Sequence, residues 1–151
     1  MRKAAARVAV MAALSLLAIP GVAWARPWGG EGFNDLGPAY VLLGVNNNGQ
    51  AKVRNVQLII ACTDVGDGTE SSRAFDARFG NWENLRLNRF SFEFTAFSNG
   101  RIGLVRLRGV LRSNGTGAAR VRVIASAQGD QGATIERCGG SARIELRRGG
   151  N

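Results

Sequence analysis

Two short segments of the chain place arginine at alternate positions between apolar residues. The first is "VRLRGVL" (105–111) and the second is "AARVRV" (118–123). Alternate side chains of an extended strand point to the same face, so each segment would present arginines on one side and valines or leucines on the other. A guanidinium group is planar, stays charged and binds phosphate or carboxylate through two hydrogen bonds. These arginines are therefore a candidate anion-binding surface, called here the arginine block: Arg106, Arg108, Arg120 and Arg122.

The dipeptide Asn99-Gly100 predicts a hairpin that positions the first of these segments. Both residues tolerate the positive φ angles that a two-residue type I′ turn requires. Such a turn pairs the segment "FSFEF" (90–94) with 105–109, so that Phe92 lies opposite Leu107 on the apolar face. On the polar face it places Glu93 opposite Arg106.

The next turn determines how the two arginine segments pair. A three-residue loop over 113–115, with Gly115 in the left-handed conformation, keeps all the valines and leucines on one face. It also places like charges opposite each other, Arg106 with Arg122 and Arg108 with Arg120, which destabilises an antiparallel pair. Stability alone does not explain such a block. The alternative to a binding surface is a solvated sheet face, or an edge charged to prevent aggregation.

The chain contains no histidine. This removes the commonest general base, nucleophile activator and metal ligand, and argues against hydrolase triads, zinc sites and redox-metal sites. Paired carboxylates could still hydrolyse glycosidic bonds. Carboxylates in turns and on outer faces are mostly solvated, and the sequence indicates no cleft that would hold a pair of them, so we predict a noncatalytic protein with no catalytic residues, no cofactor and no firm metal site. The acids considered are Glu31, Asp35, Glu70, Asp76, Glu83, Glu93 and Glu145.

The segment "CTDVGDGTE" (62–70) gathers carboxylates among glycines. Oxygen ligands on a flexible loop suit calcium, which makes Asp64, Asp67 and Glu70 weak calcium candidates. Their spacing differs from that of the EF-hand loop. The alternative is an ordinary polar loop.

Trp82 lies in "FGNWENL" (79–85), outside the clear alternating segments. An exposed tryptophan can stack on a sugar ring or a base, so Trp82 is a candidate stacking residue. The alternative, which we favour, is that it closes one end of the hydrophobic core. We leave Trp28 without an assigned role because its segment is rich in glycine.

Residues 1–25 have the pattern of a signal peptide. A basic start, "MRKAAAR", precedes an apolar stretch over 8–22 and the small-x-small sequence Ala23-Trp24-Ala25, which predicts cleavage between Ala25 and Arg26. The apolar stretch is shorter than the roughly 20 residues of a spanning helix, and we expect no transmembrane segment after processing. Of 20 basic residues, three would leave with the leader, so 17 basic and 11 acidic residues would remain, a net charge of +6. We expect a secreted or periplasmic basic protein.

Cys62 and Cys138 are the only cysteines. In an exported protein an isolated pair most often forms a disulfide, and only one connectivity is available here. The alternative, two free thiols with redox chemistry, lacks a C-x-x-C motif.

Six segments are strand-like, by β-branched content or by period-two alternation, and turn sequences separate them. This pattern predicts an all-β fold: an antiparallel β-sandwich or flattened barrel of about 7–8 strands with one disulfide. Residues 26–38 are rich in glycine and proline, which predicts a flexible lead-in to a single domain over 39–151. The segments are 40–45, 51–63, 86–97, 101–111, 117–127 and 141–147.

The order of features along the chain resembles that of small secreted bacterial all-β proteins. These features are an exported leader, a cysteine that ends an early strand, the segment "FSFEF", the segment "VRLRGVL" leading to "GTGAARVRV", and a cysteine before "GGSARIEL". The resemblance covers about residues 40–147. It implies a disulfide-linked β-sandwich and supplies no functional residues.

From the residues themselves we expect a noncatalytic binding module whose partner is an anionic polymer or envelope component. The alternative is a structural or protein-interaction domain, such as an inhibitor, that docks through a sheet edge or through loops near Trp82. The sequence leaves ligand and oligomeric state open.

Overall fold

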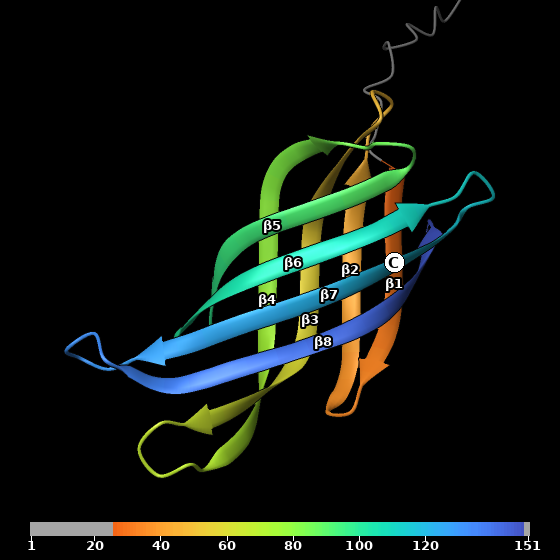
Figure 1. Ribbon diagram of the computed structural model, residues 1–151. Helices are drawn as coiled ribbons and strands as arrows, with labels where there is room; N and C mark the ends of the chain where they lie inside the picture. Colours follow the sequence, from red (N-terminus) through yellow and green to blue (C-terminus); the bar gives the residue numbers. More distant parts are fainter. Residues whose placement is uncertain (1–25, 150–151) are drawn as a thin grey trace, which may run out of the picture.

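Eight strands, each antiparallel to its neighbours, form one continuous sheet in the computed structural model, which describes residues 26–149 (Figure 1). The sheet folds over on itself, so that β5–β8 form a layer that crosses in front of the layer of β1–β4 in Figure 1. No helix occurs within the described range. The predicted all-β antiparallel architecture is confirmed, with one sheet supplying both layers. The strands are β1 (Arg26–Asn34), β2 (Gly37–Val45), β3 (Gln50–Asp64), β4 (Glu70–Asn84), β5 (Arg89–Ser98), β6 (Arg101–Leu111), β7 (Thr116–Gln128) and β8 (Thr134–Arg148), in the sheet order β4-β3-β2-β1-β8-β7-β6-β5.

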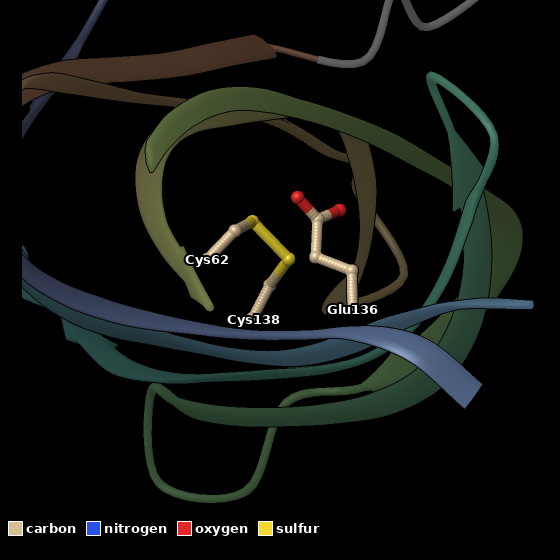
Figure 2. A group of neighbouring side chains, drawn as sticks. All are labelled: Cys62, Glu136 and Cys138. Atoms are coloured by element: carbon tan, nitrogen blue, oxygen red, sulfur yellow. A yellow bond between two sulfur atoms is a disulfide. The ribbon is translucent and has the colours of Figure 1, made fainter. Parts of the chain in front are cut away.

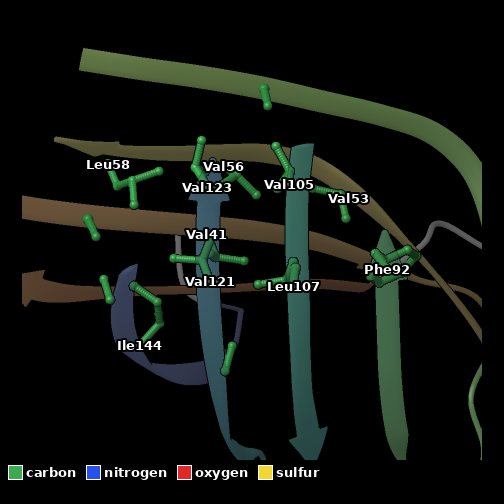
Figure 3. Close-up of a cluster of buried hydrophobic side chains, with 14 of the residues drawn as sticks. Val41, Val53, Val56, Leu58, Phe92, Val105, Leu107, Val121, Val123 and Ile144 are labelled. Carbon is green, nitrogen blue, oxygen red and sulfur yellow. The ribbon is translucent and has the colours of Figure 1, made fainter. Parts of the chain in front are cut away.

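The core lies between the two layers and contains the inward-facing half of each alternating strand (Figure 3). Val41 and Val56 come from one layer, and Leu107 and Val121 come from the other; all four are fully buried. Phe92 packs in the same core, as the alternation in "FSFEF" predicts. Each such side chain contributes about 1.5–3 kcal/mol of burial free energy. The apolar positions therefore fix which face of each strand remains outside.

A second pairing of β8 joins the layers. The later part of β8 pairs with β1, whereas its earlier part pairs with the end of β3 over Ala61–Asp64. Cys62 and Cys138 lie directly opposite each other in this second pairing and form a disulfide. The predicted disulfide is confirmed, and it is compatible with an extracellular or periplasmic location.

Removal of the disulfide is expected to lower the free energy of unfolding by about 4 kcal/mol, because the cysteines are 76 residues apart and their link restricts a long loop of the unfolded chain. The measurement is denaturant unfolding of the oxidised protein and of the Cys62→Ala/Cys138→Ala variant. Reductant should lower the stability of the first protein and leave that of the second unchanged. Equal stability of the oxidised protein and the variant would contradict the expectation.

The prediction of a flexible lead-in over 26–38 is wrong. Residues 26–34 form strand β1, which pairs with β2 on one side and with β8 on the other. Trp28, only 3% exposed, belongs to the core. Glycine is present because the backbones approach closely: a Cβ built on Gly30 would lie 1.8 Å from the carbonyl oxygen of Glu145, and one on Gly32 would lie 1.9 Å from that of Arg143. Within a strand, glycine can mark such an approach rather than a loop.

The predicted signal peptide and Ala25 lie outside the described residues, and Arg26 is the first residue of β1. Within residues 26–149 there is no helix of the length and apolarity needed to cross a lipid bilayer. All eight strands and the disulfide lie in this range.

Candidate anion-binding site

The arginine block lies on the outer face of β6 and β7, the face turned toward the viewer in Figure 1. The two hairpins have the predicted register. Asn99 and Gly100 have φ angles of 48° and 75°, and Gly115 has a φ of 84°. Consequently Arg106 pairs with Arg122, and Arg108 pairs with Arg120. The structure thus brings all four predicted arginines together.

The block forms a two-dimensional array rather than a single line. Arg143 of β8 pairs with Arg120, so Arg108, Arg120 and Arg143 form a row across three adjacent strands. Sheet geometry places neighbours in such a row about 4.8 Å apart at the backbone, and successive rows about 6.8 Å apart. The arrangement can therefore contact several anionic groups of one ligand at the same time.

Only one member of the block has a carboxylate partner within the described residues. The Nε atom of Arg106 donates a hydrogen bond to Glu93, with a distance of 2.6 Å between Nε and Oε2. This is the pair expected from the Asn99-Gly100 hairpin. The remaining salt bridge of the described range is Arg101–Glu136, so Arg108, Arg120 and Arg122 have no carboxylate within 4.0 Å. Three adjacent cations are left without a counter-charge from residues 26–149.

The side chains of the block surround a shallow hollow of about 260 Å³, lined by all four arginines. This is smaller than the roughly 300–1,000 Å³ of typical small-molecule pockets. A second groove begins at Arg108 and extends toward the β4–β5 and β6–β7 turns, and its lining includes Glu83, Arg86, Arg89 and Arg112. The shape suits one anionic group of an extended ligand better than an enclosed small molecule.

Two carboxylates border the arginines at the junction of β8 and β1. Glu31 and Glu145 lie directly opposite each other there, and both are exposed. They line one groove together with Arg120 and Arg143. Arg147, also exposed, follows Glu145 by two residues on β8, so the two acids interrupt the basic face locally.

An apolar group beside the block was missed from the sequence. Phe97 pairs with Ile102, and Leu104 pairs with Ile124, on the same outer face as the arginines. These four residues are called here the outer apolar patch. The signal was present in the alternation, because positions 102 and 104 share a face with Arg106, and position 124 shares a face with Arg122.

The calcium candidates do not form a site within residues 26–149. The Oδ1 atom of Asp64 accepts hydrogen bonds from the backbone amides of Gly66 and Asp67 at 2.7 and 3.1 Å. Asp67 accepts one from the amide of Thr69 at 2.8 Å, and hydrogen bonds from the Thr69 side chain and backbone lower the pKa of Asp67. The two aspartates thus stabilise the turn, as in the polar-loop interpretation, and Glu70 begins β4.

One group of three metal-ligating residue types does gather in the described range: Cys62, Cys138 and Glu136 (Figure 2). The two sulfur atoms are bonded to each other. Glu136 accepts a hydrogen bond of 2.6 Å from Nε of Arg101, and both side chains are mostly buried. The disulfide joins β3 to β8 and the Arg101–Glu136 ion pair joins β6 to β8, so the group has a structural role.

Trp82 is not part of the core, although we favoured that role from the sequence. It lies partly exposed on β4, and the Nζ atom of Lys52 lies 4.8 Å from its ring centroid. This cation–π contact covers one face of the ring. Trp28 has a similar contact with Arg148, at 5.3 Å, at the border of the core. A ligand that stacks on the same face of Trp82 would have to displace the lysine.

The two edges of the sheet, β4 and β5, face each other. The amide of Asp76 donates to the Ser98 hydroxyl at 3.0 Å, and the side-chain amide of Asn99 donates to the carbonyl of Ala74 at 3.1 Å. These bonds occupy backbone groups that an added strand would need. They therefore argue against the alternative in which a protein partner docks through this edge of the sheet.

No protein-family model matches the chain, and no curated protein matches it.

Proposed function

We propose that this protein is an exported, noncatalytic binding module that holds an anionic polymer or another anionic envelope component on the arginine block. The observation that carries the proposal is the set of three adjacent guanidinium groups, Arg108, Arg120 and Arg122, with no carboxylate partner in the described range. Like charges in neighbouring positions of a sheet oppose folding. An anionic ligand would offset that repulsion by supplying the missing counter-charge.

The shape of the surface supports an extended ligand. A row of arginines crosses three strands, and a groove continues from Arg108 toward Arg89 and Arg112. Guanidinium groups bind sulfate, phosphate or carboxylate through paired hydrogen bonds. A polymer with repeated anionic groups can make several such contacts along one path.

Export is part of the proposal and has two supports. The first is the leader pattern of residues 1–25, and the second is the Cys62–Cys138 disulfide, which persists in oxidising compartments. Together they favour a location in the periplasm or outside the cell.

The proposal predicts strongly salt-dependent binding. Dextran sulfate serves as the probe, and neutral dextran of the same length serves as the control. If three to four arginines displace condensed counterions, the logarithm of the binding constant should fall with the logarithm of salt concentration with a slope of about −2 to −4. Fluorescence titration at several salt concentrations measures this slope. Equal affinity for both polymers, or a slope near zero, would refute the proposal.

A further inference from the structure

The outer apolar patch exposes several large hydrophobic side chains on one sheet face. Phe97 is 71% exposed, Ile102 is 47% exposed and Ile124 is 48% exposed. Leu104, which pairs with Ile124, is half-buried among them. Single exposed apolar residues are common on soluble proteins, whereas a contiguous group marks an interaction site.

The patch is continuous with the arginine block. Arg106 follows Leu104 by two residues on β6, and Arg122 precedes Ile124 by two residues on β7, so these side chains are immediate neighbours on one face. On the far side Ser126 lies between Ile102 and the exposed Arg137. Arginines therefore flank the patch on two sides.

We infer that this combined face binds the surface of an anionic lipid layer, with the outer apolar patch entering the boundary between headgroups and acyl chains. The arginines would bind lipid phosphates at the same time. Proteins that lie on membranes combine buried apolar area with attraction between basic side chains and anionic lipids, and this face holds both. The inference rests on the proposed function, since it names the ligand class of the same site.

Charge complementarity selects this occupant over two others. A second copy of the chain seated on the patch would bring another arginine block close to the first, and the two blocks would repel. A linear polyanion would neutralise the arginines and leave Phe97, Ile102 and Ile124 in water. An anionic lipid layer satisfies both halves of the face.

The test compares a patch variant with a control that removes exposed apolar side chains elsewhere. The patch variant is Phe97→Thr/Ile102→Thr/Ile124→Thr, and the control is Leu36→Thr/Val65→Thr, whose two positions lie in turns and are 42% and 50% exposed. Each is made in the chain that begins at Arg26, which contains all eight strands and the disulfide and lacks the apolar stretch 8–22. Vesicles of phosphatidylglycerol and phosphatidylcholine are the lipid probe, vesicles of phosphatidylcholine alone are the neutral control, and dextran sulfate is the polymer probe.

We expect the parent protein and the control variant to bind the phosphatidylglycerol vesicles, and the patch variant to bind them at least tenfold more weakly. All three should bind dextran sulfate equally. Equal vesicle binding by the patch variant, or dextran sulfate binding without vesicle binding, would overturn the lipid inference and leave the proposed function standing. If the parent protein binds neither the vesicles nor dextran sulfate, both the lipid inference and the proposed function are overturned. A dimer that light scattering detects in the parent protein and not in the patch variant would show that a second copy covers the patch, which would also overturn the inference.

Discussion

Replacement of Gly30 by alanine is expected to lower the free energy of unfolding by about 3 kcal/mol or more. The new Cβ would lie 1.8 Å from the carbonyl oxygen of Glu145 and 3.1 Å from the Cα of Leu146, both of which are backbone atoms of β8. No side-chain rotation relieves this contact, so β1 and β8 would have to separate. Their separation would also withdraw Trp28 from the core.

Gly80→Ala is the matched control, because Gly80 also lies in a strand and a Cβ built on it would meet nothing within 4 Å. It should leave stability unchanged or raise it by a few tenths of a kcal/mol. Thermal unfolding of both variants measures the difference, which should be at least about 10 °C for a domain of this size. If Gly30→Ala melts within about 1 °C of the parent protein, β1 does not pack against β8 as described.

The hairpins of β5, β6 and β7 were predictable because two independent signals agree there. The Asn99-Gly100 turn fixes one register, and the alternation of apolar residues fixes the face that each strand buries. The three-residue loop at 113–115 then follows as the turn that keeps both sets of valines and leucines inside. The pairing of Arg106 with Arg122 is a consequence of the packing of their neighbours.

Strands β1 and β4 were missed for different reasons. In β1 glycine permits close contact between backbones, a property that depends on β8, far away in the sequence. In β4 the residues are mostly polar, because it is an edge strand that buries little beyond Phe75 and Ala77. Local composition therefore indicated loops where contacts with distant segments produce strands.

The candidate site was predictable in part. Prediction of the arginine block required only the alternation of residues in the strands and the two turns that join them. The outer apolar patch was missed although the same alternation places positions 102, 104 and 124 on the face of the arginines, because apolar side chains of a strand are ordinarily expected in the core. The contact of Lys52 with Trp82 depends on the pairing of β3 with β4, whose register shifts between Ala51 and Val56, and the turn that joins the two strands does not predict these shifts.

Replacement of the three unpartnered arginines is expected to weaken polyanion binding about 100-fold at 0.1 M salt, since each lost contact no longer releases its counterion. The variant Arg108→Ser/Arg120→Ser/Arg122→Ser leaves the Arg106–Glu93 pair in place. Its stability should equal or exceed that of the parent protein, because the change removes repulsion from a solvent-facing surface and no buried contact. Loss of binding would then be separate from loss of fold.

A matched control removes the same charge from the other layer. Arg54, Arg73 and Arg78 are exposed on β3 and β4, so Arg54→Ser/Arg73→Ser/Arg78→Ser changes the net charge by the same amount. Binding that depends on overall charge alone would weaken equally in the two variants. Binding through the arginine block would weaken chiefly in the first.

The most direct measurement is a titration of dextran sulfate into these two variants and the parent protein at 0.1 M salt, with the melting temperature of each recorded alongside. We expect the Arg108/Arg120/Arg122 variant to remain folded and to bind about 100-fold more weakly, while the Arg54/Arg73/Arg78 variant stays within about threefold of the parent protein. Equal weakening in both variants, or unchanged binding in the first, would contradict the claim that the arginine block is the binding surface.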